Sequence, residues 1–154
     1  MKENRKPMQI LMADDDEDDR RAVAKAWQTS RAANPIEFVN DGEQLMDYLQ
    51  RRGPYSSLPA GSRPGLILLD LNMPKKDGRE ALMEIKADPN LRQIPVIVLT
   101  TSKAEEDVYR TYDLGANSFI TKPVTFTALV ELVQSIGNYW IEIVELPNDE
   151  MRAE

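Results

Sequence analysis

Leu-Ile-Leu-Leu at residues 66–69 is apolar at every position and stops abruptly at a carboxylate, Asp70. A strand that is apolar at consecutive positions is buried on both faces, which is typical of a parallel sheet covered by helices. Four other short runs also predict strands, at residues 8–13, 36–39, 95–100 and 117–121. Segments with helical spacing lie between and after these runs. The alternation predicts an α/β domain with a doubly wound, five-stranded parallel sheet.

The helical segments carry recognisable start and stop signals. The first helix is expected to begin near Asp18, in an acidic turn that complements the helix dipole. Ser102 can cap the fourth helix, and Gly115 suits a residue that ends it. The last helical pattern is the longest, because its apolar spacing continues from residue 129 to residue 144. We therefore expect an extended C-terminal helix.

A length of 154 residues suits one domain. We expect an N-terminal tail at residues 1–7, the domain at residues 8–147 with its C-terminal helical extension, and a disordered tail at residues 148–154. Pro, Gly and Ser at residues 52–65 predict a long loop. No run approaches the ~20 apolar residues of a membrane span, and the N-terminal apolar run is too short for a signal peptide. These features predict a cytoplasmic protein.

The sequence contains neither cysteine nor histidine. Their absence excludes disulfides, thiolate nucleophiles, Ser-His-Asp triads and zinc sites built on imidazole or thiolate. Its 26 acidic and 19 basic residues give a net charge of -7, which argues against nucleic acid as the main partner. Chemistry must then come from carboxylates, hydroxyls, lysines and a cation that prefers oxygen ligands, such as Mg²⁺ or Ca²⁺.

Candidate reactive groups stand at the ends of four predicted strands. They are Asp14 and Asp15 after the first strand, Asp70 after the third, Thr100 at the end of the fourth, and Lys122 after the fifth. In a doubly wound sheet, ligands bind beyond the carboxyl ends of the strands, so these groups are expected to share a pocket. Three carboxylates that lie close together repel one another unless a cation neutralises them.

Mg²⁺ suits this cluster, because it binds a few carboxylates, keeps several waters and often holds a phosphate. Asn72, two residues after Asp70, could add its backbone carbonyl. Lys122 would supply a mobile cation, and Thr100 a hydroxyl that can donate to a phosphate oxygen. A carboxylate is a weak nucleophile and needs such electrostatic help to attack a phosphoryl group. The constellation therefore predicts formation of an aspartyl phosphate.

At this point the sequence resembles the receiver domain of two-component response regulators. The motifs are Ile-Leu-Met-Ala-Asp14-Asp15, Leu-Ile-Leu-Leu-Asp70-Leu-Asn72-Met-Pro-Lys-Lys-Asp-Gly, Val-Leu-Thr100-Thr-Ser and Phe119-Ile-Thr-Lys122-Pro123. They occur in the family's order and at comparable spacing, from about Gln9 to Ile136. The resemblance implies the flavodoxin-like receiver fold and a signalling function.

The resemblance also implies roles for the acidic residues. Asp70 would be the phosphoacceptor. Mg²⁺ would be bound directly by Asp15 and Asp70, by the Asn72 backbone carbonyl, and by Asp14 through water. Asp16 extends the acidic pair, so a register of Asp15 and Asp16 is an alternative; the alignment of the apolar strand favours Asp14 and Asp15.

The resemblance implies further roles at the fourth and fifth strands. Lys122 and Thr100 would bind the phosphoryl oxygens, and the Lys122-Pro123 peptide bond would be cis, which proline permits. Phe119 would be the switch aromatic that moves inward when Thr100 is drawn toward the phosphate. Phe119 has no hydroxyl, so signalling by a tyrosine hydroxyl at this position is excluded.

A narrower resemblance is to the small stand-alone regulators that partner phytochrome-type sensor histidine kinases. It rests on Leu-Asn-Met-Pro-Lys-Lys-Asp-Gly-Arg-Glu, on Ile-Pro-Val-Ile-Val-Leu-Thr-Thr-Ser, on the ending from Tyr139-Trp140 to Leu146-Pro147, and on the long loop. The apolar stripe of the last helix continues past the point where a compact domain needs it, and must be covered. We expect a homodimer interface at Tyr139, Trp140, Ile143 and Val144; the alternative is that these residues pack back onto the chain's own helices.

Three functions are compatible with the sequence. The first is a receiver, not a turnover enzyme, that catalyses its own phosphorylation at Asp70 from a kinase phosphohistidine and signals through protein contacts, since nothing after Pro147 forms an effector domain. The second is a phosphorylation-independent binding module with a receiver fold. The third is a Mg²⁺-dependent aspartyl phosphatase. Such enzymes use Asp-x-Asp after a first strand and need a cap over the substrate, whereas here the expected nucleophile follows the third strand as Asp70-Leu-Asn72 and we find no cap segment.

Overall fold

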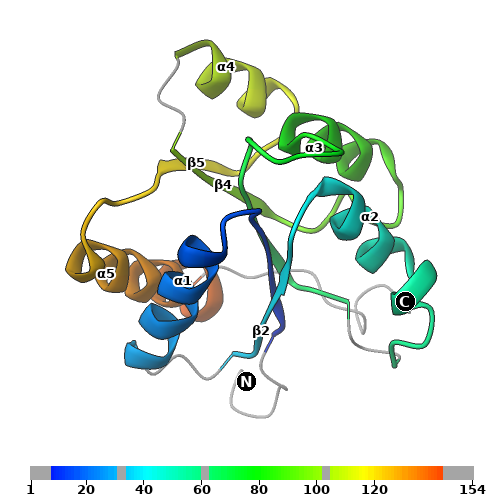
Figure 1. Cartoon of the computed structure of the whole chain (residues 1–154). Coiled ribbons are helices and arrows are strands. Elements are labelled where there is room, and N and C mark those ends of the chain that lie inside the picture. Colours follow the sequence, from blue (N-terminus) through cyan, green and yellow to red (C-terminus); the bar gives the residue numbers. More distant parts are fainter. Residues whose placement is uncertain (1–7, 31–33, 60–62, 102–104, 144–154) are drawn as a thin grey trace.

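The computed structural model describes residues 8–30, 34–59, 63–101 and 105–143, and it shows an α/β fold built on a parallel sheet (Figure 1). The strands are β1 (Ile10–Ala13), β2 (Ile36–Val39), β3 (Leu66–Leu69), β4 (Val96–Thr100) and β5 (Ser118–Thr121). Every neighbouring pair runs parallel, in the order β2-β1-β3-β4-β5. The predicted five-stranded parallel sheet is confirmed.

Helices cover both faces of this sheet. α1 (Glu17–Thr29) and α5 (Phe126–Ile136) lie side by side on one face, and α2 (Gly42–Gln50), α3 (Gly78–Ala87) and α4 (Glu105–Asp113) lie on the other (Figure 1). The strand order reverses between β1 and β3, because the chain leaves β1 toward one edge of the sheet and β3 toward the other. Ligand sites of doubly wound sheets lie at this reversal, beyond the carboxyl ends of the strands.

The central strands are buried on both faces, which explains why their sequences are apolar at consecutive positions. All residues of β1, β3 and β4 are buried. Alternate side chains enter two separate cores: Ile10 and Met12 pack on the α1 and α5 side, whereas Leu11 packs on the α2 and α3 side. Since full burial of one such side chain contributes about 1.5–3 kcal/mol, the two cores hold the strand ends in fixed positions.

Side chains that precede the helices satisfy their first backbone N–H groups. Asp16 accepts hydrogen bonds from the backbone N–H groups of Asp18 and Asp19, so it caps α1. Asp77 caps α3 in the same way, and Thr125 caps α5. Ser102, the predicted cap of α4, lies outside the described residues. The assignment of Asp16 to a cap leaves Asp14 and Asp15 as the acidic pair that faces the pocket.

The C-terminal helix extends beyond α5 as predicted. A π-helical segment, η3 (Gly137–Ile143), continues directly from Ile136. The ring of Tyr139 lies edge-on to that of Trp140, with ring centroids 5.5 Å apart. Trp140 is half-buried against the core between α1 and α5, whereas Tyr139 is 55% exposed. Val144 lies outside the described residues.

The described part of the long loop packs on the α2 side of the sheet. It contains a short 3₁₀ turn, η2 (Gly53–Tyr55), and both Tyr55 and Leu58 contact the core beneath α2 and α3. The expected tails at residues 1–7 and 148–154 lie outside the described residues. Within the described ranges, no helix combines the length and the apolar character that crossing a membrane requires.

Candidate functional site

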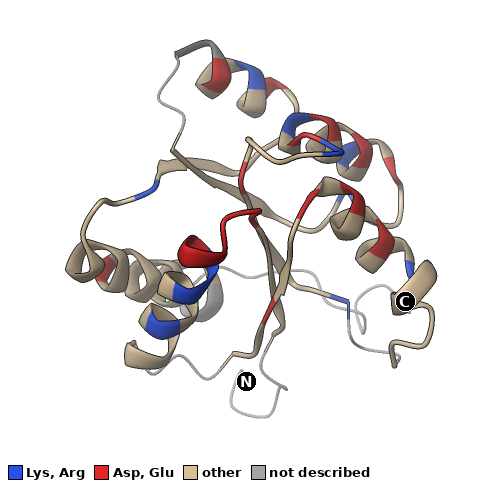
Figure 2. Cartoon of the chain, viewed as in Figure 1, with Lys and Arg blue, Asp and Glu red and all other residues tan. Residues whose placement is uncertain are grey.

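The predicted acidic cluster forms at the carboxyl ends of β1 and β3. Carboxylate oxygens of Asp14, Asp15 and Asp70 all lie within 4.8 Å of one another. Asp14 and Asp70 are buried, and Asp15 is exposed, so the cluster is open to solvent on one side. Figure 2 shows the acidic turn that leads into α1 directly beside the ends of these strands. The predicted convergence of Asp14, Asp15 and Asp70 is confirmed.

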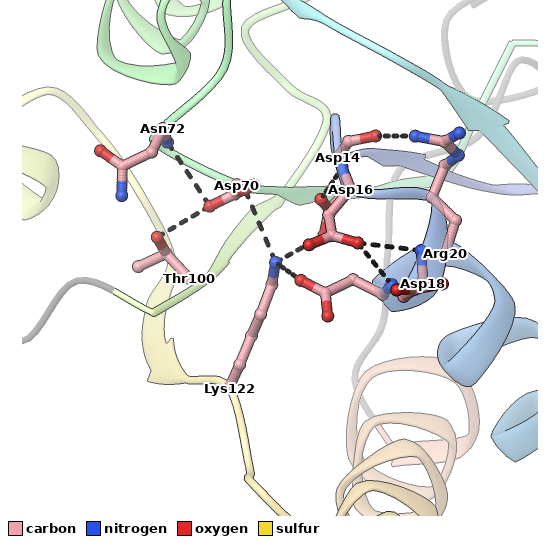
Figure 3. A network of polar contacts seen from close by, with 9 residues as sticks. Asp14, Asp16, Asp18, Arg20, Asp70, Asn72, Thr100 and Lys122 are labelled. Carbon is pink, nitrogen blue, oxygen red and sulfur yellow. Dashed lines mark hydrogen bonds and ion pairs between the residues drawn. The ribbon is translucent and has the colours of Figure 1, made fainter.

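The carboxylate of Asp70 is held by contacts from its own loop and from two other segments (Figure 3). The hydroxyl of Thr100, at the end of β4, donates to Asp70 Oδ1 at 2.8 Å. The backbone N–H of Asn72 donates to the same oxygen at 3.4 Å. Lys122 Nζ lies 3.5 Å from Asp70 Oδ2. One carboxylate oxygen therefore accepts the two hydrogen bonds, and the other faces the ammonium group.

Lys122 reaches the pocket from the segment after β5 and pairs with acids on two elements. Its Nζ lies 2.5 Å from Asp14 Oδ2 (Figure 3). It also lies 2.7 Å from Asp19 Oδ2. Burial disfavours the ammonium charge, but the hydrogen bonds with Asp14 and Asp19 outweigh it and raise the pKa of Lys122 above its usual value. Lys122 is therefore a fixed positive charge in the pocket at neutral pH.

Asp19 is a site residue that the sequence reading missed. It lies in the first turn of α1, where an acidic residue is sufficiently explained by the helix dipole. Asp19 lies three residues after the cap Asp16, about one turn into the helix. This spacing indicates that its side chain is on the side of α1 that faces the strand ends.

Burial and ion pairing act in opposite directions on the carboxyl of Asp14. Burial raises the pKa of Asp14, and the hydrogen bonds from Lys122 and from the backbone N–H of Asp16 offset that increase only in part. A buried carboxylate is stabilised by additional positive charge. Three carboxylate oxygens within reach of one ion, one of them on an exposed residue, are the ligand type that Mg²⁺ and Mn²⁺ prefer. The residues therefore fit a divalent cation.

The loop between β3 and α3 is packed directly against the backbone of Asp70. The N–H of Gly78, the first residue of α3, donates to the carbonyl of Leu71 at 2.9 Å. A Cβ atom at Gly78 would lie 2.2 Å from the carbonyl oxygen of Asp70, so the position has no room for a side chain. The Asp-Gly pair in the sequence thus serves the close approach of α3 to the site.

The structure corrects one prediction at the Lys122-Pro123 peptide bond. No peptide bond in the described ranges is cis, so this bond is trans. A trans bond before proline is favoured by about 0.5–1 kcal/mol. The backbone N–H of Lys122 donates to the carbonyl of Thr100 at 2.8 Å, and the side chain still reaches Asp14. The site is therefore assembled without a cis bond.

Phe119 does not lie among the polar groups of the pocket. It is on β5, half-buried, and its ring packs against the core on the α2 and α3 side. Its backbone N–H donates to the hydroxyl of Tyr112, on α4, at 3.1 Å. The predicted movement of Phe119 with Thr100 stays a prediction.

Comparison with protein families and known proteins agrees with this geometry. The model of the response regulator receiver domain family matches residues 10–134. The response regulator Rcp1 of Synechocystis sp. (strain ATCC 27184 / PCC 6803 / Kazusa) is 45% identical over 145 residues, which cover 94% of this chain and 97% of Rcp1. The family is one of receivers and not of classical enzymes, which argues against the phosphatase alternative.

Solved structures of similar proteins include Rcp1 and several phytochrome response regulators. The Mn²⁺-bound form of Rcp1 is 45% identical, with a TM-score of 0.83, covering 92% of this chain and 99% of that one. The phosphorylated cyanobacterial phytochrome response regulator RcpA is 42% identical, with a TM-score of 0.86, covering 93% and 100%. The bacteriophytochrome response regulator AtBRR is 37% identical, with a TM-score of 0.74, covering 92% and 100%.

Proposed function

Because this chain belongs to the response regulator receiver family, we propose that it accepts a phosphoryl group on Asp70 from a phosphohistidine of a partner sensor kinase. One observation carries this proposal. The Asp70 carboxylate lies between the Thr100 hydroxyl and the Lys122 ammonium, within reach of Asp14 and Asp15. Nucleophile, hydrogen-bond donor, fixed cation and metal-binding oxygens thus occur in one pocket.

The chemistry that this arrangement supports is transfer between two side chains. An Asp70 carboxylate oxygen attacks phosphorus, a P–O bond forms, and the P–N bond to the partner's imidazole breaks with its electron pair left on that nitrogen. Lys122 would compensate the negative charge of the phosphoryl oxygens. Thr100, whose hydroxyl donates to Asp70 in this structure, would turn to donate to a phosphoryl oxygen. This change of partner is the event that distinguishes the phosphorylated form.

The proposal includes Mg²⁺ as the cofactor. Asp15 and Asp70 would bind it directly, with the Asn72 backbone carbonyl, and Asp14 would bind through water. A bound Mg²⁺ would neutralise the carboxylates and the phosphoryl oxygens. Support comes from the three clustered carboxylates and from the existence of Rcp1 in an Mn²⁺-bound form.

The proposed partner is a phytochrome-type sensor histidine kinase, since the similar proteins include the phytochrome response regulator RcpA and the bacteriophytochrome response regulator AtBRR. Such a kinase phosphorylates its histidine from cytoplasmic ATP, so the proposal includes a cytoplasmic location. The chain itself contains no histidine, and the phosphohistidine must therefore belong to the partner. Phosphorylation would then be read out through protein contacts.

Acetyl phosphate tests the proposal without any kinase. Incubation with acetyl phosphate and Mg²⁺ should add the mass of one phosphoryl group to the intact chain. Asp70→Asn should abolish the gain, because an amide cannot attack phosphorus, while Asp113→Asn, at an exposed position of α4, should leave it unchanged. No adduct on the wild type, or one that survives Asp70→Asn, would reject the proposal and favour a phosphorylation-independent binding module.

We also propose a homodimer through Tyr139, Trp140, Ile143 and Val144. Tyr139 is 55% exposed at the end of the extended helix, where an apolar stripe needs cover. Trp140 already packs partly on the chain's own core, so Tyr139 is the residue to test.

Sedimentation velocity should show a dimer at tens of micromolar protein, and Tyr139→Ser should weaken dimerisation about tenfold, as loss of a buried aromatic anchor does. Met83→Ser, which removes an exposed apolar side chain from α3, should leave the dimer intact. A strictly monomeric wild type would rule out this interface.

A further inference from the structure

α4 is attached to the domain with little apolar burial. The structure describes the α4 side chains of residues 107–113. Within this range one side chain, that of Thr111, is buried, and it is polar. Its hydroxyl donates to carbonyls of the same helix, those of Asp107 and Val108. Tyr109 and Tyr112 are 67% and 48% exposed. By contrast, α1, α3 and α5 each bury three apolar side chains, which are Val23, Ala26 and Trp27 in α1, Ala81, Leu82 and Ile85 in α3, and Leu129, Val133 and Ile136 in α5.

Arg79, in the first turn of α3, makes close polar contacts with Asp107 on α4. Its Nε lies 2.9 Å from Asp107 Oδ1, and its Nη2 lies 2.7 Å from Asp107 Oδ2. The third nitrogen, Nη1, lies 3.1 and 3.0 Å from the two oxygens of Asp77. The side chains of Arg79 and Asp107 are only 19% and 15% exposed. Such a two-pronged, largely buried pair is stronger and more directional than a surface ion pair.

The base of Arg79 is fixed to the backbone of the proposed phosphoacceptor. The neighbouring residue, Gly78, packs so closely on the Asp70 carbonyl that no Cβ would fit. Asp77 caps α3 and accepts a hydrogen bond from the Arg79 backbone N–H at 2.7 Å. A continuous chain of contacts therefore runs from Asp70 through the start of α3 and Arg79 to α4.

A second polar contact joins α4 to the outer edge of the sheet. The Tyr112 hydroxyl accepts the backbone N–H of Phe119, on the edge strand β5, at 3.1 Å. This bond involves neutral groups and a half-exposed side chain. It is expected to be weaker than the contact with Arg79.

We propose that Arg79 is a positioning residue that ties α4 to the loop after Asp70 through its ion pair with Asp107, in place of apolar packing. α4 can then change position when Asp70 is phosphorylated. The first half of this proposal concerns the unphosphorylated protein alone. The second half rests on the proposed phosphorylation of Asp70. A helix held mainly by one directional ion pair, with a weaker hydrogen bond at Tyr112, can be either attached or released, whereas a helix held by a core cannot.

Hydrogen exchange of the unphosphorylated full chain tests the tie. Arg79→Gln should speed exchange of the α4 amides about tenfold, the factor that corresponds to about 1.4 kcal/mol, and should leave α1 and α5 unchanged. Arg79→Lys keeps the charge but cannot contact both oxygens of Asp107 with two nitrogens. Its α4 exchange rate should fall between those of wild type and Arg79→Gln. Arg21→Gln, which breaks the exposed pair with Glu17 on α1, is the matched control and should leave α4 unchanged. Unchanged α4 exchange in Arg79→Gln, or an equal increase in all helices, would overturn the tie.

A second arm tests the link to the site. After acetyl phosphate and Mg²⁺ have added a phosphoryl group, confirmed by intact mass, α4 exchange should differ from that of the unmodified wild type. The difference should shrink at least about threefold in Arg79→Gln, because its helix is already released. An adduct that leaves wild-type α4 exchange unchanged would overturn the link while the receiver function stands. Absence of an adduct would instead reject the receiver function, and the first arm would still decide the tie.

Discussion

Replacing Lys122 with methionine should slow phosphorylation of Asp70 by acetyl phosphate about 10²- to 10³-fold, the usual effect of removing one preorganised group that stabilises transition-state charge. Lys122 Nζ lies 3.5 Å from the acceptor carboxylate, and its raised pKa keeps it charged at neutral pH. Methionine keeps much of the aliphatic length but supplies no charge. The rate is measured by intact mass over time.

The same substitution should destabilise the metal-free protein by about 3 kcal/mol, because it leaves the fully buried Asp14 without its partner at 2.5 Å. Rates are therefore compared at a temperature where circular dichroism shows both proteins folded. Lys25→Met is the matched control: Lys25 is an exposed lysine on α1 whose ammonium lies over the Phe126 ring. It should keep the wild-type rate. A folded Lys122→Met that reacts as fast as wild type would show that Lys122 does not act on the phosphoryl group.

The site could be predicted from the sequence because its residues stand at strand ends. A short apolar run fixes where a strand stops, and parallel strands in one sheet stop at the same edge. Asp14, Asp70 and Thr100 could therefore be assigned to one pocket, although up to 86 positions separate them along the chain. The polar contacts observed between Asp70, Thr100 and Lys122 follow from this rule.

Contacts that depend on the relative placement of helices could not be predicted. Arg79 and Asp107 lie 28 positions apart on two helices, and neither helical periodicity nor capping signals indicate which surface residues of two helices meet. The contact of Asp19 with Lys122 could not be predicted for a different reason. An acidic residue in the first turn of a helix is already explained by the helix dipole. The isomer of the Lys122-Pro123 bond depends on an energy difference of about 0.5–1 kcal/mol, which residue identities alone do not settle.

Asp14→Asn should have the opposite effect on stability from Lys122→Met. Burial raises the pKa of Asp14, so between its ordinary value of 3.8 and that raised value the folded chain binds more protons than the unfolded chain. Folding stability therefore falls as pH rises through this window, and the penalty is fully present above the raised pKa. An asparagine of nearly the same shape carries no such penalty. The metal-free variant should be more stable than wild type at pH 7.5, by about 1–2 kcal/mol, as is usual for stabilising changes at functional sites.

Chemical denaturation in the presence of EDTA measures this gain, which should shrink as pH is lowered from 7.5 toward the ordinary pKa of 3.8, because the folded wild type takes up a proton on Asp14 before the unfolded chain does. Adding Mg²⁺ should reverse the order of the two proteins, since an ion that binds only the folded state stabilises it, and the variant lacks one carboxylate of the cluster. Asp113→Asn, at an exposed position of α4, should change stability by less than about 0.5 kcal/mol.

The stability of Asp14→Asn separates two effects on Asp14, which are its ion pair with Lys122 and the burial of its carboxylate. If Asp14→Asn is less stable than wild type without metal, the ion pair with Lys122 contributes more than burial of the carboxylate costs, and the raised pKa is not the dominant effect. If it is more stable without metal and also loses the response to Mg²⁺, then the fold retains a buried carboxylate that weakens it. Such a carboxylate is kept for the cation that it binds. The acidic cluster then destabilises the metal-free fold, and a bound cation removes this destabilisation.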